Sequence, residues 1–178
     1  LLLGGGIVSA AEPQTLVVYN WAEYLPKKVL QQFTQETGIK VRYSTYDSNE
    51  AMYAKVKTVK GAGYDLLVPS TYYVDRMRRE GLLQKLNKTR LSHFGNLNPR
   101  LLNQSYDPNN DYSIPYLWGT TGIAYNADKM PPGQLTSWAE LWNPAYKNKL
   151  LLLNDMREVF SMGLKVLGYS INSTDENQ

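Results

Sequence analysis

Short runs of β-branched and aromatic residues alternate with helix-length amphipathic segments over the first 81 residues. This alternation restricts the fold more than any other feature of the chain. Strands are expected at residues 16–19, 41–43 and 66–68, and the helical segments after them are expected to end at Gly38, Gly61 and Gly81. Parallel strands need long crossover connections of this kind. The pattern therefore predicts an α/β protein with a mainly parallel sheet flanked by helices.

The rest of the chain gives a weaker pattern. Residues 87–111 are rich in Asn, Pro and Ser, and we expect a long loop with short helical pieces there. Further strands are expected at 114–118, 121–125 and 150–153, before a last helix that carries Phe160, Leu164 and Leu167. A parallel sheet begun near Thr121 would hold too few strands to bury both of its faces. We therefore expect a second lobe that is incomplete.

Three segments are predicted along the chain: a residual signal peptide (1–11), a partial first lobe (12–118) and the start of a truncated second lobe (119–178). The apolar run at the front is too short to cross a bilayer, and it ends in the small residues Ala10 and Ala11. It predicts export. An ordinary N-terminal strand or a disordered tail is the alternative.

Few kinds of reactive site can be built from this composition. The chain has no cysteine and one histidine, His93, so thiolate zinc sites, disulfides and cysteine nucleophiles are excluded. Nucleotide-binding glycine motifs are absent as well. The net charge of +3 is small. Its densest basic cluster, Arg76 to Arg79, is flanked by acidic residues, which favours a solvated helix face over a nucleic-acid surface. We expect no enzyme, no cofactor, no metal and no nucleic-acid partner.

One motif has the spacing of a calcium loop. Asp107, Asn109 and Asp111 match its first ligands, but Tyr112 and Trp118 stand where the loop needs Gly and Glu. A turn closed by an Asp side chain is the better interpretation.

Aromatic and acidic residues follow the predicted strands. In open α/β sheets, ligands bind outside the carboxyl ends of the strands. The residues at these ends are Trp21, Glu23, Tyr24, Ser70, Tyr72, Asp155 and Glu158. Carboxylates accept charge-assisted hydrogen bonds from ammonium groups, and aromatic faces cover methylenes and attract cations. The set suits a slender organic cation, with a sugar as the competing ligand. Asp155 and Glu158 also have the spacing of a helix capping box.

Several segments of the chain resemble the spermidine/putrescine-binding periplasmic proteins of ABC importers. The resemblance runs from about residue 16 to residue 174 and includes Tyr-Asn-Trp-Ala-Glu-Tyr (19–24), Phe-Thr-Gln-Glu-Thr-Gly-Ile-Lys-Val (33–41), Val-Pro-Ser-Thr-Tyr-Tyr-Val-Asp (68–75), Asp-Pro-Asn-Asn-Asp-Tyr-Ser-Ile-Pro-Tyr (107–116) and Arg-Glu-Val-Phe (157–160). It implies the periplasmic-binding-protein fold, with two lobes that close around the ligand and a crossover near residues 118–122. It also implies a monomer located in the periplasm with two partners, a polyamine and an ABC permease in the inner membrane.

The resemblance also implies a role for each candidate residue. Trp21 and Tyr24 would be aromatic walls and Glu23 a nearby acidic contact. Ser70 and Tyr72 would form a polar and aromatic edge, while Asp155 and Glu158 would accept hydrogen bonds from ammonium groups. Position 22 is Ala, where the family implies a hydroxyl residue, so one hydrogen bond is absent and the preferred polyamine stays open.

Three alternatives remain at this point. The chain could be a binding protein for another solute such as a sugar, or a fragment without function of its own. An exported hydrolase using Asp155 and Glu158 is disfavoured, because residues three apart on one helical turn do not flank a substrate from opposite sides.

Overall fold

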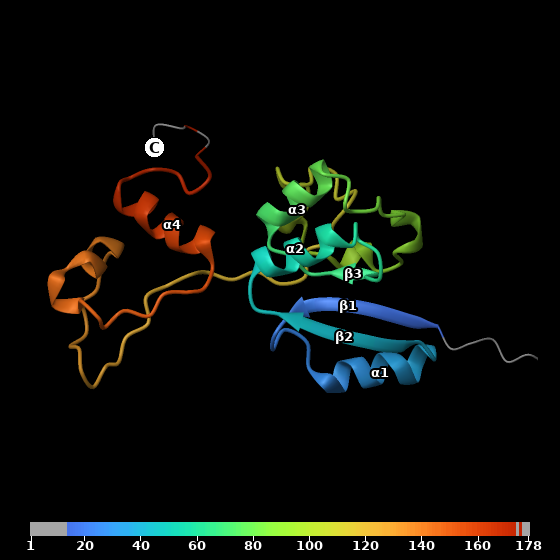
Figure 1. Cartoon of the computed structure of the whole chain (residues 1–178), viewed down its shortest axis with the longest axis horizontal. Coiled ribbons are helices and arrows are strands. Elements are labelled where there is room, and N and C mark those ends of the chain that lie inside the picture. Colours follow the sequence, from blue (N-terminus) through green and yellow to red (C-terminus); the bar gives the residue numbers. More distant parts are fainter. Residues whose placement is uncertain (1–13, 174, 176–178) are drawn as a thin grey trace, which may run out of the picture. The chain divides into compact units, whose positions relative to one another are not determined.

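The structure is a computed structural model that describes residues 14–173 and residue 175. The chain divides into two compact units, residues 1–116 and 117–178, and each is described by itself. Within the first unit, strands alternate with helices along the chain (Figure 1). The predicted signal-peptide remnant at residues 1–11 lies outside the described residues.

A three-stranded parallel sheet forms the centre of the first unit. It consists of β1 (Thr15–Trp21), β2 (Lys40–Tyr46) and the short β3 (Leu66–Leu67), in the order β2-β1-β3. Both pairings are parallel, and the last residues of β1 and β2, Trp21 and Tyr46, are partners in the register. The strands predicted in this part of the chain are confirmed, as is the α/β class.

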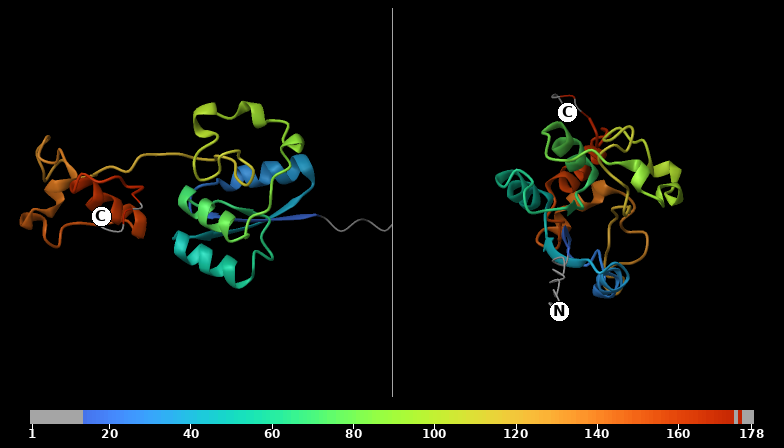
Figure 2. Two further views of the ribbon diagram at one scale, coloured as in Figure 1. Left: turned by 90° about the horizontal axis from the view of Figure 1, so that it is seen from above. Right: turned by 90° about the vertical axis from the view of Figure 1, so that its right-hand side faces the viewer.

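Three helices connect and follow these strands: α1 (Lys27–Thr37), α2 (Asn49–Thr58) and α3 (Thr71–Arg79). α1 begins directly after Pro26 and ends at Gly38, whose φ of 72° is the left-handed conformation that glycine adopts without steric cost. α1 lies on the opposite side of the strands from α2 and α3 (Figures 1 and 2).

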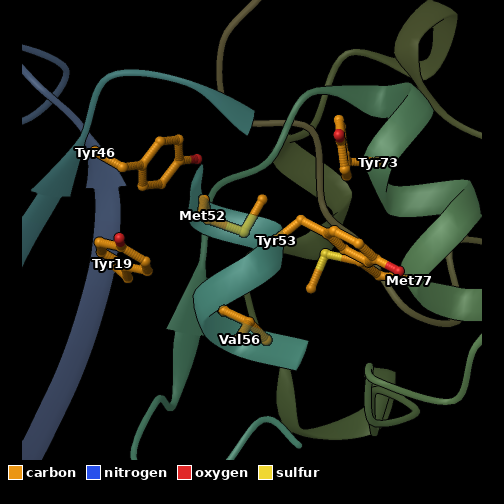
Figure 3. Close-up of a cluster of buried hydrophobic side chains, with 7 residues drawn as sticks. All are labelled: Tyr19, Tyr46, Met52, Tyr53, Val56, Tyr73 and Met77. Atoms are coloured by element: carbon orange, nitrogen blue, oxygen red, sulfur yellow. The ribbon is translucent and has the colours of Figure 1, made fainter. Parts of the chain in front are cut away.

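The hydrophobic core lies between the sheet and the pair α2 and α3. Figure 3 shows its seven buried side chains, which are Tyr19, Tyr46, Met52, Tyr53, Val56, Tyr73 and Met77. Met52, Val56 and Met77 have no exposed surface. Met52 and Val56 are four residues apart on α2, so they share the helix face that packs on the core. The carboxyl ends of β1 and β2, where the candidate site lies, pack on this core through Trp21 and Tyr46.

The region after α3 is a loop with short helical pieces, as predicted. Its 3-10 turns are η1 (Lys88–Arg90), η2 (Phe94–Asn96) and η3 (Pro99–Leu101). The carboxylate of the buried Asp107 accepts hydrogen bonds from the backbone N–H groups of Asp111, Tyr112 and Ser113, at 3.1, 2.9 and 2.8 Å. The predicted Asp-closed turn is therefore confirmed.

The basic residues of α3 are paired with acids on the same helix or at its C-cap. Arg78 and Arg79 contact Asp75 at 2.9 and 2.5 Å, and Arg76 contacts Glu80 at 3.1 Å. The predicted solvated, charge-paired helix face is confirmed.

The second unit holds η4 (Trp138–Trp142), η5 (Pro144–Tyr146) and α4 (Met156–Val166). The strands predicted at 114–118, 121–125 and 150–153 are wrong, because the structure has no regular secondary structure at these residues. Strands need hydrogen-bonding partners, and the described residues of the second unit include no strand to pair with. Leu151, expected to be buried, is 98% exposed. No described residue from 117 onward is buried.

No helix within the described part of the chain combines the length and the apolar character that a membrane crossing requires.

Candidate functional site

Trp21 ends β1 at the carboxyl edge of the sheet, where its ring lies against two tyrosines. The ring centroids are 4.7 Å from Tyr46 and 6.1 Å from Tyr24. The backbone of Trp21 is held on both sides: its N–H donates to Oδ1 of Asn20 at 2.7 Å, and its carbonyl accepts from the Tyr43 hydroxyl at 3.3 Å. The indole therefore stands on a fixed stretch of strand.

The turn after Trp21 carries Glu23 and Tyr24. Glu23 has a φ of 61°, in the left-handed region that side chains other than glycine rarely adopt. Its side chain is exposed, and Tyr24 is 42% exposed. The Tyr24 carbonyl accepts a 2.6 Å hydrogen bond from the hydroxyl of Tyr116, a residue at the far end of the same unit. The turn thus presents an acid and an aromatic ring while its backbone is anchored.

Tyr46, at the end of β2, connects two strand ends. Its buried hydroxyl donates to the backbone carbonyl of Val68, directly after β3. Burial raises the pKa of the Tyr46 phenol, so the group stays protonated and keeps its role as donor. The Tyr46 ring, which lies against Trp21, is therefore held by a hydrogen bond to the residue that follows β3, the strand on the other side of β1.

Asn49 connects β2 to the residues after β3 in a second way. Its side chain is fully buried at the start of α2. Its Nδ2 donates to the Ser70 hydroxyl at 3.0 Å and to the Tyr72 hydroxyl at 2.8 Å, and its Oδ1 accepts from the Ser70 N–H at 3.1 Å. Ser70 and Tyr72, which the sequence places after β3, are therefore held at the same edge of the sheet.

In the second unit, Asp155 and Glu158 lie in the first turn of α4. Asp155 is the N-cap, and one of its carboxylate oxygens accepts from the Glu158 N–H at 3.1 Å. The Glu158 carboxylate accepts from the Thr121 hydroxyl at 2.8 Å. The N-cap hydrogen bond of the predicted capping box, from the Glu158 N–H to Asp155, is confirmed. It does not exclude ligand contact, because a carboxylate has about four lone-pair positions.

The predicted site residues thus fall into two sets. The first unit brings together Trp21, Glu23, Tyr24, Ser70 and Tyr72 at the carboxyl edge of its sheet, and the second holds Asp155 and Glu158 at one helix terminus. The sequence analysis missed Tyr46 and Asn49. Tyr46 ends β2, three residues beyond the strand predicted at 41–43, so the rule about carboxyl ends of strands finds it only when the strand is given its full length. Nothing in the sequence pattern distinguishes Asn49.

The arrangement in the first unit is aromatic and rich in hydroxyl groups. Rings of this kind cover methylene groups or stack on apolar ligand faces, and they attract cations. The described residues contain no group of three or more His, Asp or Glu side chains that could hold a metal ion.

The chain is similar to known transport proteins over its whole length. It is 58% identical over 178 residues to a spermidine/putrescine-binding periplasmic protein of Salmonella typhimurium. The aligned region covers 100% of this chain and 51% of the relative. The chain therefore spans about half the length of this curated relative.

Solved structures agree with this similarity. A Listeria monocytogenes protein assigned provisionally to a spermidine/putrescine ABC transporter matches with a TM-score of 0.86 at 43% identity, over 92% of this chain and 51% of the other. The substrate-binding protein of a Streptococcus pneumoniae spermidine/putrescine ABC transporter matches with a TM-score of 0.74 at 47% identity, over 92% of this chain and 50% of the other.

A family model also matches most of the chain. The model for bacterial extracellular solute-binding proteins covers residues 28–178, which include α2 to α4, α1 except its first residue, and the residues of both sets except Trp21, Glu23 and Tyr24. The chain therefore belongs to the family of bacterial extracellular solute-binding proteins.

Proposed function

We propose that this protein binds a linear polyamine, spermidine or putrescine, and delivers it to an ABC importer. The observation that carries the proposal is the aromatic edge of the first unit. Trp21, Tyr24 and Tyr46 lie ring to ring where β1 and β2 end, with the Ser70 and Tyr72 hydroxyls held nearby by Asn49. A polyamine alternates ammonium groups with methylenes, and this edge offers rings for the methylenes and oxygens for the ammonium groups.

Acids complete the chemistry that a polyamine requires. Glu23 is exposed on the turn after β1, and Asp155 and Glu158 lie in the first turn of α4. Charge-assisted hydrogen bonds from ammonium to carboxylate are about twice as strong as neutral ones. The net charge of +3 does not attract a cation, so the attraction has to come from these local carboxylates.

The relatives support the same ligand class. Relatives at 58% and 46% identity are named spermidine/putrescine-binding, and others, at 39% and 38% identity, are named putrescine-binding. Ala22 lies beside Trp21 without a hydroxyl group, and titration with both polyamines determines which of them is preferred.

The proposal extends to where and how the protein acts. The protein acts in the periplasm as a monomeric receptor and carries out no catalytic step. Closure of its two lobes on the cation signals occupancy to a permease in the inner membrane. A ligand favours such a closed state only through contacts that the open state lacks.

Isothermal titration tests the proposal. The gene product, read to its natural stop codon, is titrated with spermidine, with putrescine and with the neutral sugars glucose and maltose. Binding of a polyamine without binding of sugar supports the proposal. A folded protein that binds a sugar, or neither kind of ligand, overturns it.

A further inference from the structure

The buried side chain of Asn49 forms hydrogen bonds with two of the proposed ligand contacts, Ser70 and Tyr72. The side chain has no exposed surface, so it cannot touch a ligand in solution directly. All three of its hydrogen bonds described above run to Ser70 and Tyr72. A buried amide with this set of partners links the start of α2 to the start of α3.

The direction of these hydrogen bonds is fixed by one of them. The backbone N–H of Ser70 can only donate, so the atom of Asn49 that faces it has to be the oxygen Oδ1. The nitrogen Nδ2 is then turned toward the two hydroxyls, and both of them accept from it. Turning the amide over would place its N–H₂ group against the Ser70 N–H and lose the hydrogen bond.

This polarity decides what the hydroxyls present on their other sides. Each hydroxyl oxygen uses one lone pair on Asn49, and its own proton cannot point back at Nδ2, which is a donor. The second lone pair of the Ser70 oxygen is directed away from Asn49. An ammonium group needs such an acceptor.

We infer that Asn49 is a positioning residue for polyamine binding, which holds the Ser70 and Tyr72 hydroxyls in place and sets their hydrogen-bond polarity. The inference rests on the proposed function, because it takes Ser70 and Tyr72 as ligand contacts. Asn49 acts only through them, so its effect on affinity has to disappear when they lose their hydroxyls.

A double-mutant cycle in the full gene product measures this dependence. Asn49→Ala is expected to weaken spermidine binding about tenfold, the upper range for a net hydrogen-bond contribution. In a Ser70→Ala, Tyr72→Phe background, the same substitution is expected to change affinity by less than about twofold, because the two hydroxyls through which Asn49 would act on the ligand are gone, while the Ser70 N–H that donates to Asn49 is kept. An equal loss in both backgrounds, or no loss in either, overturns the inference.

Ser48→Ala is the matched control. Ser48 is the N-cap of α2, and its hydroxyl accepts from the Ala51 N–H at 3.2 Å. Removing this cap weakens the same helix end without touching Ser70 or Tyr72. Spermidine affinity is expected to stay within about twofold of the wild type, whatever the loss of stability. A tenfold loss here would mean that Asn49 acts only by stabilising α2.

A readout without ligand separates this inference from the proposed function. With 3-fluorotyrosine incorporated, the Tyr72 resonance is assigned by its absence in Tyr72→Phe. Asn49→Ala is expected to shift or broaden this resonance and to leave that of Tyr125 in the second unit unchanged. Asn49→Asp keeps the shape of the side chain and the acceptor for the Ser70 N–H but removes the Nδ2 donor. It replaces Asn49→Ala as the test variant if Asn49→Ala does not fold.

The two readouts have different meanings. If the wild type binds no polyamine, the proposed function fails, while the fluorine spectrum still shows whether Asn49 holds Tyr72. A Tyr72 resonance that is the same with and without the Asn49 amide overturns the positioning role.

Discussion

The hydroxyl of Tyr116 donates a 2.6 Å hydrogen bond to the backbone carbonyl of Tyr24, across 92 residues of sequence. It ties the turn that carries Glu23 and Tyr24 to the last residue of the first unit. The turn has a left-handed residue at Glu23, so it needs such support from outside.

Tyr116→Phe is therefore expected to loosen this turn. The order parameter of the Tyr24 amide should fall from about 0.85, typical of rigid backbone, to below about 0.6. Backbone ¹⁵N relaxation measures it. Tyr125→Phe, the same substitution on an exposed tyrosine of the second unit, should leave Tyr24 unchanged. An equally rigid Tyr24 amide in Tyr116→Phe would show that the hydrogen bond does not support the turn.

Glu80 gives the first unit an acid-sensitive contact. Hydrogen bonds from the Tyr53 hydroxyl and the Lys57 ammonium lower the pKa of Glu80 from 4.5 to about 2, and Arg76 adds to the effect. A carboxylate whose pKa is lower in the folded state stabilises the fold above its unfolded pKa. That stabilisation is lost as the pH falls from 4.5 to about 2.

Glu80→Gln is expected to flatten the pH dependence of the unfolding free energy in this window. Urea unfolding at a series of pH values measures it. Tyr53→Phe removes the largest cause of the lowered pKa of Glu80 and should partly flatten the pH dependence of the unfolding free energy in the same window. An unchanged slope in Glu80→Gln would contradict the assignment.

Asp107 holds the loop before residue 116 in shape. Its buried carboxylate accepts three backbone N–H groups and the Ser113 hydroxyl, the latter at 2.8 Å. Asp107→Ala leaves these donors unpaired and is expected to cost about 3 kcal/mol of unfolding free energy, read from urea unfolding. The exposed Asp47→Ala is the control and should change it by less than about 0.5 kcal/mol. A loss for Asp107→Ala as small as that of the control would contradict the turn's structural role.

The sequence predicted the first unit well because its signals are local. Gly38 ends α1 through its own backbone conformation, and Met52 and Val56 are spaced for one helix face. The position of Trp21 and Ser70 at one edge followed from a general rule about parallel sheets. These features depend on few residues close in sequence.

The wrong predictions depended on partners far away in the sequence. The leucines at 150–153 have the composition of a buried strand, but a strand exists only when another strand pairs with it, and Leu151 is exposed here. The role of Asn49 likewise depends on the start of α3, 21 residues away. Composition and spacing carry no information about such contacts.

Titration of spermidine into Asp155→Asn tests the central claim, polyamine binding through local carboxylates, most directly. Asn keeps an oxygen that can accept from the Glu158 N–H, so the cap of α4 is retained while the charge is removed. We expect a loss of about ten- to a hundredfold in affinity, the range for a hydrogen bond to a charged group. Asp128→Asn, which removes an exposed acid of the same unit, should leave the affinity unchanged. Equal spermidine affinity in Asp155→Asn and the wild type would contradict the account.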